Sequence, residues 1–231
     1  SWLTTHLEYK AIHDNILKLD LLGHVDPMAL KMLCDLTNKK VNDIPLNDKK
    51  VLSIFHTTKA LKLGTNFLQE QNGALGIPEF GTSFVRGLLN ETKPKTFNDL
   101  IIISGLSHGT DVWAGNAQKL IATGVTDLDG VIGCRDDIMT YLMSKGISGS
   151  MSFEIMEAVR KKKGVNEKHE KIMTDHGVPH FYIDSCNKIQ YLFPKAHATA
   201  YVMMAVRVGY FKVYYPLEYY AVFFTLRSKQ Y

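Results

Sequence analysis

A lysine and a histidine stand two residues apart where a helix is predicted to begin, in the segment Phe193-Pro-Lys-Ala-His-Ala-Thr-Ala-Tyr201. Pro194 suits the first turn of a helix, and the apolar run that follows continues at helical spacing. The free amide groups and the positive dipole end of such a helix attract anions, and Lys195 and His197 would add donors at the same place. The arrangement suits a phosphate group, although the same residues also fit an ordinary capped helix with a buried histidine.

Aromatic side chains stand on both sides of these two donors. Tyr191, Phe193 and Tyr201 offer flat surfaces on which a nucleobase can stack, because every base has a π face. A glycine-flanked polar loop earlier in the chain carries Ser107 and His108, and such a loop more often binds a ligand than fills a core. Together these features suit a nucleotide.

Further cations lie at predicted helix ends. Arg135 falls in the first turn of its helix, where a positive charge is unfavourable. Its position indicates an anionic ligand, or a carboxylate partner such as Asp136 or Asp137. Arg160 and Lys161 open a run of four basic residues that closes another helix. Cations there complement the helix dipole, and they could equally contact a phosphate backbone.

One carboxylate lies near the end of an apolar run. Residues Asn15–Leu22 form the best strand candidate, closed by Gly23, and Asp20 lies near its end. A carboxylate at that place is costly unless it is paired or binds a metal, and its oxygen atoms suit Mg²⁺; a turn residue before the glycine is the other interpretation. Asp127 and Asp129 lie in a polar loop, where aspartates commonly cap turns, and we assign them that role.

Helices must position most of these residues. After Pro27 the pattern is mostly helical, the glycine-rich stretch 64–81 is typical of a connector, and several helices end at a glycine, including one at Gly105. The sequence therefore predicts a mainly α fold, in which a short β-strand precedes a multi-helix domain. The predicted helices are Pro27–Leu36, Asp48–Phe55 (capped by Asn47 or Asp48), Thr82–Asn90, Asn98–Ile103, Asn116–Thr123, Arg135–Lys145, Ser152–Lys163, Asn166–His176, Pro179–Leu192, Ala196–Tyr215 and Leu217–Leu226.

Composition agrees with one large domain built on a real core. The chain has 231 residues, 45% of them hydrophobic, and its net charge of +4 permits a polyanionic partner without requiring one. Three cysteines lie far apart without metal-ligand spacing, which argues against disulfides and structural zinc and favours a reducing cytoplasm. Charges and a proline interrupt the apolar stretch 201–226, so we expect a buried helix pair and no membrane span. Because the chain begins without Met, in mid-pattern, we interpret it as a piece of a longer protein.

Motifs along nearly the whole chain resemble those of one protein family, and they occur in the same order as in that family. They resemble the PolC-type alpha subunit of DNA polymerase III, within the bacterial C-family of replicative polymerases. The matching segments are Thr4-Thr-His6, Ala11-Ile-His-Asp-Asn15, Leu17-Lys-Leu-Asp-Leu-Leu-Gly-His24, Leu75-Gly-Ile-Pro-Glu-Phe-Gly81, Ser104-Gly-Leu-Ser-His-Gly-Thr-Asp-Val-Trp113, Gly133-Cys-Arg-Asp-Asp-Ile-Met139, Tyr182-Ile-Asp-Ser-Cys186, Phe193-Pro-Lys-Ala-His197 and Tyr210-Phe-Lys-Val213.

The resemblance implies a domain division and a metal ligand. Residues 1–26 would be the end of an α+β palm domain with its last catalytic strand, and residues 27–231 would be the fingers domain. In this family three palm aspartates hold two Mg²⁺ ions for nucleotide addition, and Asp20 matches the third. The first two form an Asp-x-Asp pair upstream that this chain lacks. The piece alone is therefore expected not to polymerise.

The resemblance also implies roles for the fingers residues. The fingers close over the incoming deoxynucleotide (dNTP), so we expect Arg135 and Lys195 near its phosphates with His197 assisting. The residues expected around the nascent base pair are Ser107, His108, Tyr191 and Phe193. Arg160 and Lys161 would face phosphates of the nucleotide or the template.

The implied partners are those of a replicative polymerase. They are primer–template DNA, dNTP and the rest of the polymerase chain, with the sliding clamp and replisome proteins reached through other parts. The rival hypothesis is a non-catalytic helical module that binds nucleic acid through the basic run at 160–163. It would bind DNA with a steep salt dependence and without regard to Mg²⁺ or free nucleotide.

Overall fold

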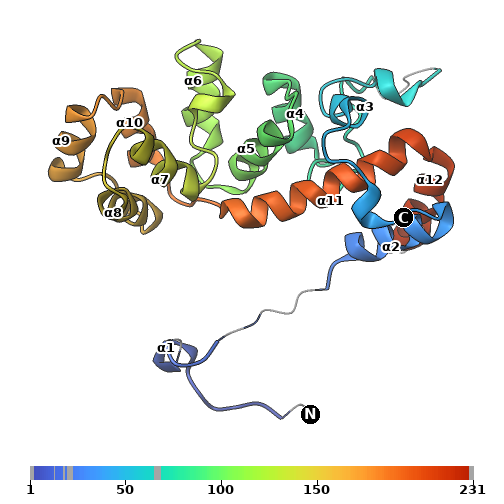
Figure 1. Ribbon diagram of the computed structural model, residues 1–231, viewed down its shortest axis with the longest axis horizontal. Helices are drawn as coiled ribbons and strands as arrows, with labels where there is room; N and C mark the ends of the chain where they lie inside the picture. The colour runs from blue at the N-terminus through green and yellow to red at the C-terminus, as the bar shows by residue number, and fades with distance from the viewer. Residues whose placement is uncertain (1–2, 13, 18, 20–22, 65–68, 229–231) are drawn as a thin grey trace.

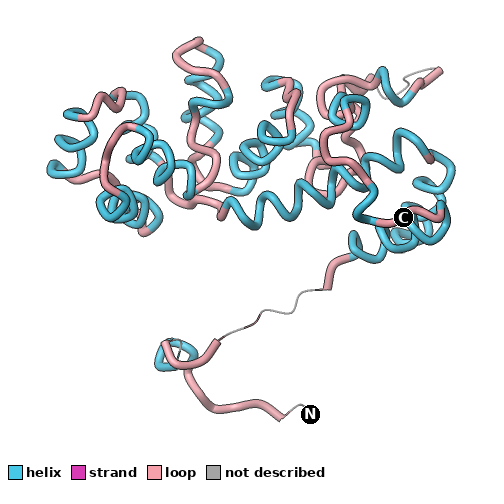
Figure 2. The backbone as a smooth tube through the Cα atoms, viewed as in Figure 1, coloured by secondary structure: helices cyan, strands magenta, loops and turns pink. Residues whose placement is uncertain are grey.

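The computed structural model describes residues 3–12, 14–17, 19, 23–64 and 69–228, and these residues are predominantly helical (Figures 1 and 2). Among them the only β-type pairings are two isolated bridges, Thr110 with Tyr191 and Cys134 with Phe193. The predicted mainly α fold class is confirmed. The elements are α1 (Tyr9–Ile12), α2 (Val25–Thr37), η1 (Val41–Asp43), α3 (Lys49–Ser53), η2 (Lys59–Leu61), α4 (Ser83–Thr92), α5 (Phe97–His108), η3 (Trp113–Ala117), α6 (Gln118–Ala122), η4 (Leu128–Gly130), α7 (Arg135–Ser144), α8 (Gly149–Arg160), α9 (Glu167–Asp175), α10 (His180–Lys188), α11 (Lys195–Tyr214) and α12 (Pro216–Arg227).

The short strand expected at 15–22 is not present in the described part of that segment. Residues 15–17 and 19 form turn and coil, and Asp20 lies outside the described residues. A strand needs a neighbour to take its backbone hydrogen bonds, and the described residues offer none beside this segment. The preceding helix α1 is a single turn that buries no side chain, and it lies apart from the other helices (Figure 1).

The longest helix in the described part of the chain is α11, which has 20 residues. It is about 30 Å long, and it runs along the base of the helical body in Figure 1, where α2, α3, α5, α7 and α12 pack against it. Small residues let these neighbours approach closely: a Cβ added to Gly209 would stand 3.2 Å from Cδ1 of Ile54. The buried helix pair expected at the C-terminal end is thus α11 and α12. No helix in the described part of the chain is both long and apolar enough to cross a membrane.

Most helices begin and end close to the capping and terminating residues that the sequence predicted. Asp48 caps α3 by accepting hydrogen bonds from two backbone amides, and Thr82 and Asn166 cap α4 and α9 by accepting one each. The expectation that Gly105 ends its helix was wrong, because α5 continues to His108. Gly105 is inside α5 for a packing reason, since a Cβ there would overlap the carbonyl oxygen of Gly133 and stand 2.7 Å from Sγ of Cys134.

Candidate functional site

An extended segment between α10 and α11 carries two of the predicted site residues, Tyr191 and Phe193. The helix predicted to reach Leu192 stops at Lys188, and the chain that follows is held by backbone hydrogen bonds on two sides. Thr110 N donates to Tyr191 O at 3.0 Å, and Arg135 N donates to Phe193 O at 3.1 Å. The segment is therefore clamped between the end of α5 and the start of α7, which brings together motifs that lie far apart in the sequence.

Carboxylates at the start of α7 occupy the positions nearest to Lys195. The Nζ atom of Lys195 donates to Oδ1 of Asp137 at 2.7 Å, and the backbone N of Lys195 donates to Oδ2 of Asp136 at 2.8 Å. Burial lowers the pKa of Lys195, but the hydrogen bond and the charge of Asp137 outweigh it and leave the pKa raised. Nε of Arg135 stands 3.9 Å from Asp136. The carboxylate partner considered for Arg135 is thus present, and Asp136 also caps α11.

Rings from three elements form a continuous row beside this helix start. His108 stacks on Phe193 with ring centroids 4.6 Å apart and planes at 19°. The Phe193 ring meets the edge of His197 at 5.0 Å, and His197 lies 4.6 Å from Tyr201. Tyr191 is outside the row and its side chain is 46% exposed. The row gives the site flat surfaces, which the aromatic pattern predicted.

Lys195 and His197 do not converge on one point. Two residues along an α-helix correspond to a rotation of about 200°, so the two side chains leave α11 on different sides. Lys195 lines a pocket of about 310 Å³ with Asp137, Tyr141 and Tyr182. The His197 pocket, about 260 Å³, includes His24, Asp26 and Tyr201.

Ser107 and His108 occupy the last turn of α5, not a loop. Oγ of Ser107 donates to Ser104 O at 2.9 Å and lies 3.1 Å from Nδ1 of His108. Nε2 of His108 lies 3.0 Å from Oε2 of Glu79, a partner that sequence reasoning missed. Glu79 is 29 residues away in the chain, and no spacing rule links a connector residue to a helix end at that distance. Its place in a family motif was the one available signal.

Arg160 and Lys161 lie elsewhere. They end α8, which packs on α7 at one end of the molecule, away from the first turn of α11 (Figure 1). Two nitrogen atoms of Arg160 donate to the carboxylate of Glu157 at 2.6 and 2.7 Å, and Nζ of Lys161 stands 3.4 Å from it. These pairs hold the pKa of Glu157 at about 2, chiefly through the Arg160 hydrogen bonds. The basic run at 160–163 is therefore not part of the aromatic row.

The described residues do not form a metal site. No group of three or more His, Cys, Asp or Glu side chains among them could hold an ion. Asp127 accepts a hydrogen bond from Gly130 N at 3.2 Å, so its predicted role in a turn is confirmed. The predicted ligand Asp20 lies outside the described residues.

Comparison with known proteins places the chain in a family. The family described as the bacterial DNA polymerase III alpha subunit finger domain matches residues 26–179. Over all 231 residues the chain is 55% identical to the DNA polymerase III PolC-type proteins of Staphylococcus aureus strains MW2, USA300 and NCTC 8325, and it spans 16% of the length of each. The chain therefore belongs to the finger domain family of the bacterial DNA polymerase III alpha subunit, as its motifs predicted.

Proposed function

We propose that this chain supplies the nucleotide-facing fingers of a bacterial replicative DNA polymerase, with residues 27–231 as the fingers and residues 1–26 as the end of the palm. The observation that carries the proposal is the clamped segment at 190–194. It sets the stacked rings of His108 and Phe193 beside the start of α11, where Lys195 and Arg135 supply positive charge. Flat rings next to cations match the two halves of a nucleotide, its base and its phosphates.

The two halves of the site would bind different parts of the substrate. His108, Phe193, Ser107 and Tyr191 would face the nascent base pair. The triphosphate would lie on the Lys195 and Arg135 side, and His197, which leaves α11 on a different side, would assist from there. Arg160 and Lys161, which lie apart from this site, would face template phosphates.

Lys195 can exchange its partner at small cost. Its side chain is 35% exposed and its pair with Asp137 opens on a pocket. Ion pairs between exposed side chains contribute only about 0–1 kcal/mol, and the 35% exposure of Lys195 lets solvent weaken its pair with Asp137, whose side chain is 17% exposed. A triphosphate carries more negative charge than one carboxylate, so it would compete well for the ammonium group.

The chemistry of nucleotide addition would belong to other parts of the polymerase. Asp20 would supply one Mg²⁺ ligand beside two aspartates from the preceding palm, and the bound ions would activate the primer hydroxyl and stabilise the leaving pyrophosphate. The fingers would contribute positioning and charge. Such a polymerase would act on primer–template DNA in the cytoplasm and reach the sliding clamp and the replisome through other parts. The isolated chain would be inactive, and primer extension by it would contradict this.

The test uses the full-length polymerase. Lys195→Gln and Arg135→Gln should each raise the KM for dNTP by roughly tenfold, because each removes a charge-assisted hydrogen bond to phosphate. DNA affinity should stay the same. Lys168→Gln is the matched control, since Lys168 is an exposed lysine that stands 3.9 Å from a glutamate on the α8–α9 side.

The rival function is a helical nucleic-acid-binding module. Its support is the basic run at 160–163, which lies apart from the aromatic row. It predicts that the two glutamine variants leave KM unchanged, while Lys162→Gln and Lys163→Gln weaken DNA binding and flatten its salt dependence. That combined result would refute the proposed nucleotide site and support the DNA-binding module.

A further inference from the structure

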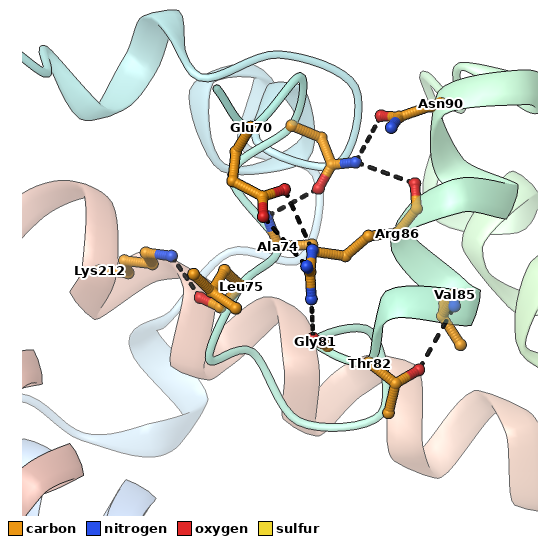
Figure 3. Close-up of polar contacts among 10 residues, drawn as sticks. Glu70, Ala74, Leu75, Gly81, Thr82, Val85, Arg86, Asn90 and Lys212 are labelled. Atoms are coloured by element: carbon orange, nitrogen blue, oxygen red, sulfur yellow. Dashed lines mark hydrogen bonds and ion pairs between the residues drawn. The ribbon is translucent and has the colours of Figure 1, made fainter. Parts of the chain in front are cut away.

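The loop at 70–82 is held in place from two sides (Figure 3). From α11, the buried Nζ of Lys212 donates to Gly73 O at 2.8 Å and to Leu75 O at 2.6 Å. From α4, Arg86 binds both carboxylate oxygens of Glu70, at 3.0 and 3.1 Å, and donates to Gly81 O. Bonds at both ends of the loop restrict its backbone.

Buried side chains hold the middle of the same loop. Ile77 and Phe80 are almost fully buried, and the Phe80 ring packs edge-on against Phe55 at 5.1 Å. The hydroxyl of Tyr219 donates to Gly76 O at 2.7 Å. Glu79 lies between two buried residues, so its position is set by the core.

Glu79 also adopts a backbone conformation that its side chain does not favour. Its φ is 64°, in the left-handed region, where a residue with a Cβ is strained and glycine is not. Strain of this kind persists only where the surrounding structure fixes the conformation, as the buried neighbours of Glu79 do here. The carboxylate of Glu79 lies 3.0 Å from Nε2 of His108.

Both ring nitrogens of His108 face hydrogen-bond acceptors. Nδ1 lies 2.8 Å from Ser104 O, and Nε2 lies 3.0 Å from the carboxylate of Glu79. A carbonyl oxygen and a carboxylate only accept, so these two contacts favour the form of the ring in which both nitrogens carry a proton, although the Ser107 hydroxyl also lies 3.1 Å from Nδ1. The pKa of His108 is accordingly raised, first by the hydrogen bond to Glu79.

Other ionisable groups lie near the pair. His197 reaches it across Phe193, and His24 and Asp26 lie beyond, at the start of α2. The hydrogen bond from His108 lowers the pKa of Glu79, and the nearby charges of His24 and His197 act in the same direction. The carboxylate therefore stays ionised, and its charge favours the protonated form of His108.

We propose that Glu79 is a positioning residue, which holds His108 as an imidazolium stacked on Phe193 and so fixes the charged, flat surface that meets the incoming nucleotide. A cation over an aromatic face is attracted to it, so the protonated ring holds Phe193 better than a neutral one. This role rests on the proposed nucleotide site and adds to it the group that controls its charge.

The experiment measures the KM for dNTP against pH in the full-length polymerase. Glu79→Gln keeps the length and an acceptor oxygen but removes the charge, so His108 should then lose a proton near its ordinary pKa of about 6.5. We expect the KM to rise with pH in both proteins, but the rise should begin at a lower pH in Glu79→Gln than in the wild type, with a difference of up to roughly tenfold between the two. At pH 6 the variant should approach the wild type, a rescue that loss of structure would not give.

A matched control and a second variant separate this role from folding. His169 and Glu154 form another histidine–glutamate pair, at 3.1 Å between α8 and α9, and Glu154→Gln should leave the pH profile of KM unchanged. Glu79→Gly relieves the strained φ but removes the acceptor, so it should keep its melting temperature and still show the shifted pH profile of KM.

Two results would overturn the proposal. One is a KM for Glu79→Gln that equals the wild-type value or differs from it by the same factor at every pH. The other is the same shift of the pH profile in Glu154→Gln. If Lys195→Gln raises KM and Glu79→Gln does not, the positioning role alone fails; if neither does, the proposed nucleotide site fails with it.

Discussion

Two glycines in neighbouring helices are expected to respond to alanine in opposite ways. Gly105 lies inside α5, where an added Cβ would overlap the carbonyl oxygen of Gly133 and stand 2.7 Å from Sγ of Cys134. Gly87 lies inside α4, and an added Cβ there would meet no atom within 4 Å. The chemical change is the same at both sites, so the difference between the two variants measures packing.

The magnitudes follow from helix propensity and overpacking. Alanine is more favourable than glycine in a helix by about 1 kcal/mol, so Gly87→Ala should raise the free energy of unfolding by about that amount. At Gly105 the same gain is opposed by overpacking against backbone, which costs about 3 kcal/mol at the upper end of its usual range. The net loss of about 2 kcal/mol should lower the melting temperature by about 4–8 °C, whereas Gly87→Ala should raise it by about 2–4 °C.

The assay is urea unfolding of the 231-residue chain, followed by circular dichroism, with a thermal melt as the second measurement. The slope of free energy against urea should be equal in both variants, because neither changes the surface exposed on unfolding. Equal stability of Gly105→Ala and Gly87→Ala would refute the close approach of α5 to Gly133. It would also remove the reason given for a glycine inside α5.

Three further outcomes are expected in the same chain. Asp137→Ala should lower the free energy of unfolding by about 2 kcal/mol, because it leaves the buried amides of Gly133 and Cys134 unpaired. Asp127→Ala, in an exposed turn, should lower it by less than about 1 kcal/mol. Equal losses in the two variants would contradict this expectation. Burial raises the pKa of the Cys134 and Cys186 thiols to about 12, so both should react with a thiol reagent only after unfolding. Burial lowers the pKa of Lys212 to about 8, and the unfolded chain therefore holds more protons between pH 8 and 10.5. The free energy of unfolding should rise across that interval, by at most about 3 kcal/mol relative to Lys212→Met, and a parallel profile in the two chains would show that the shift is absent.

Much of the helical architecture was predictable from short stretches of sequence. Asp48, Thr82 and Asn166 cap helices as their types suggest, and Gly124, Gly146 and Gly177 adopt positive φ just after helices end. These signals are local, because a cap or a stop acts through backbone groups within one turn. Local signals also misled at Gly105, where contact with a segment far along the chain prevailed over the tendency of glycine to end a helix.

Several side chains of the candidate site were named from the sequence, but their pairing was not, and Glu79 was missed. The sequence identified Lys195, Arg135, His108 and Phe193 from their types and from the family they resemble. It did not reveal that Lys195 binds Asp137 across 58 residues, or that His108 meets Glu79 across 29.

By itself the sequence determined the mainly helical fold, the family and a list of candidate site residues, since each depends on composition, spacing or order along the chain. The tertiary structure alone decided which charges are paired and which rings stack. It also decided that Lys195 and His197 leave α11 on different sides. The physical reason is that contacts between distant residues form only when packing brings their helices together, and no local preference of the chain encodes that meeting.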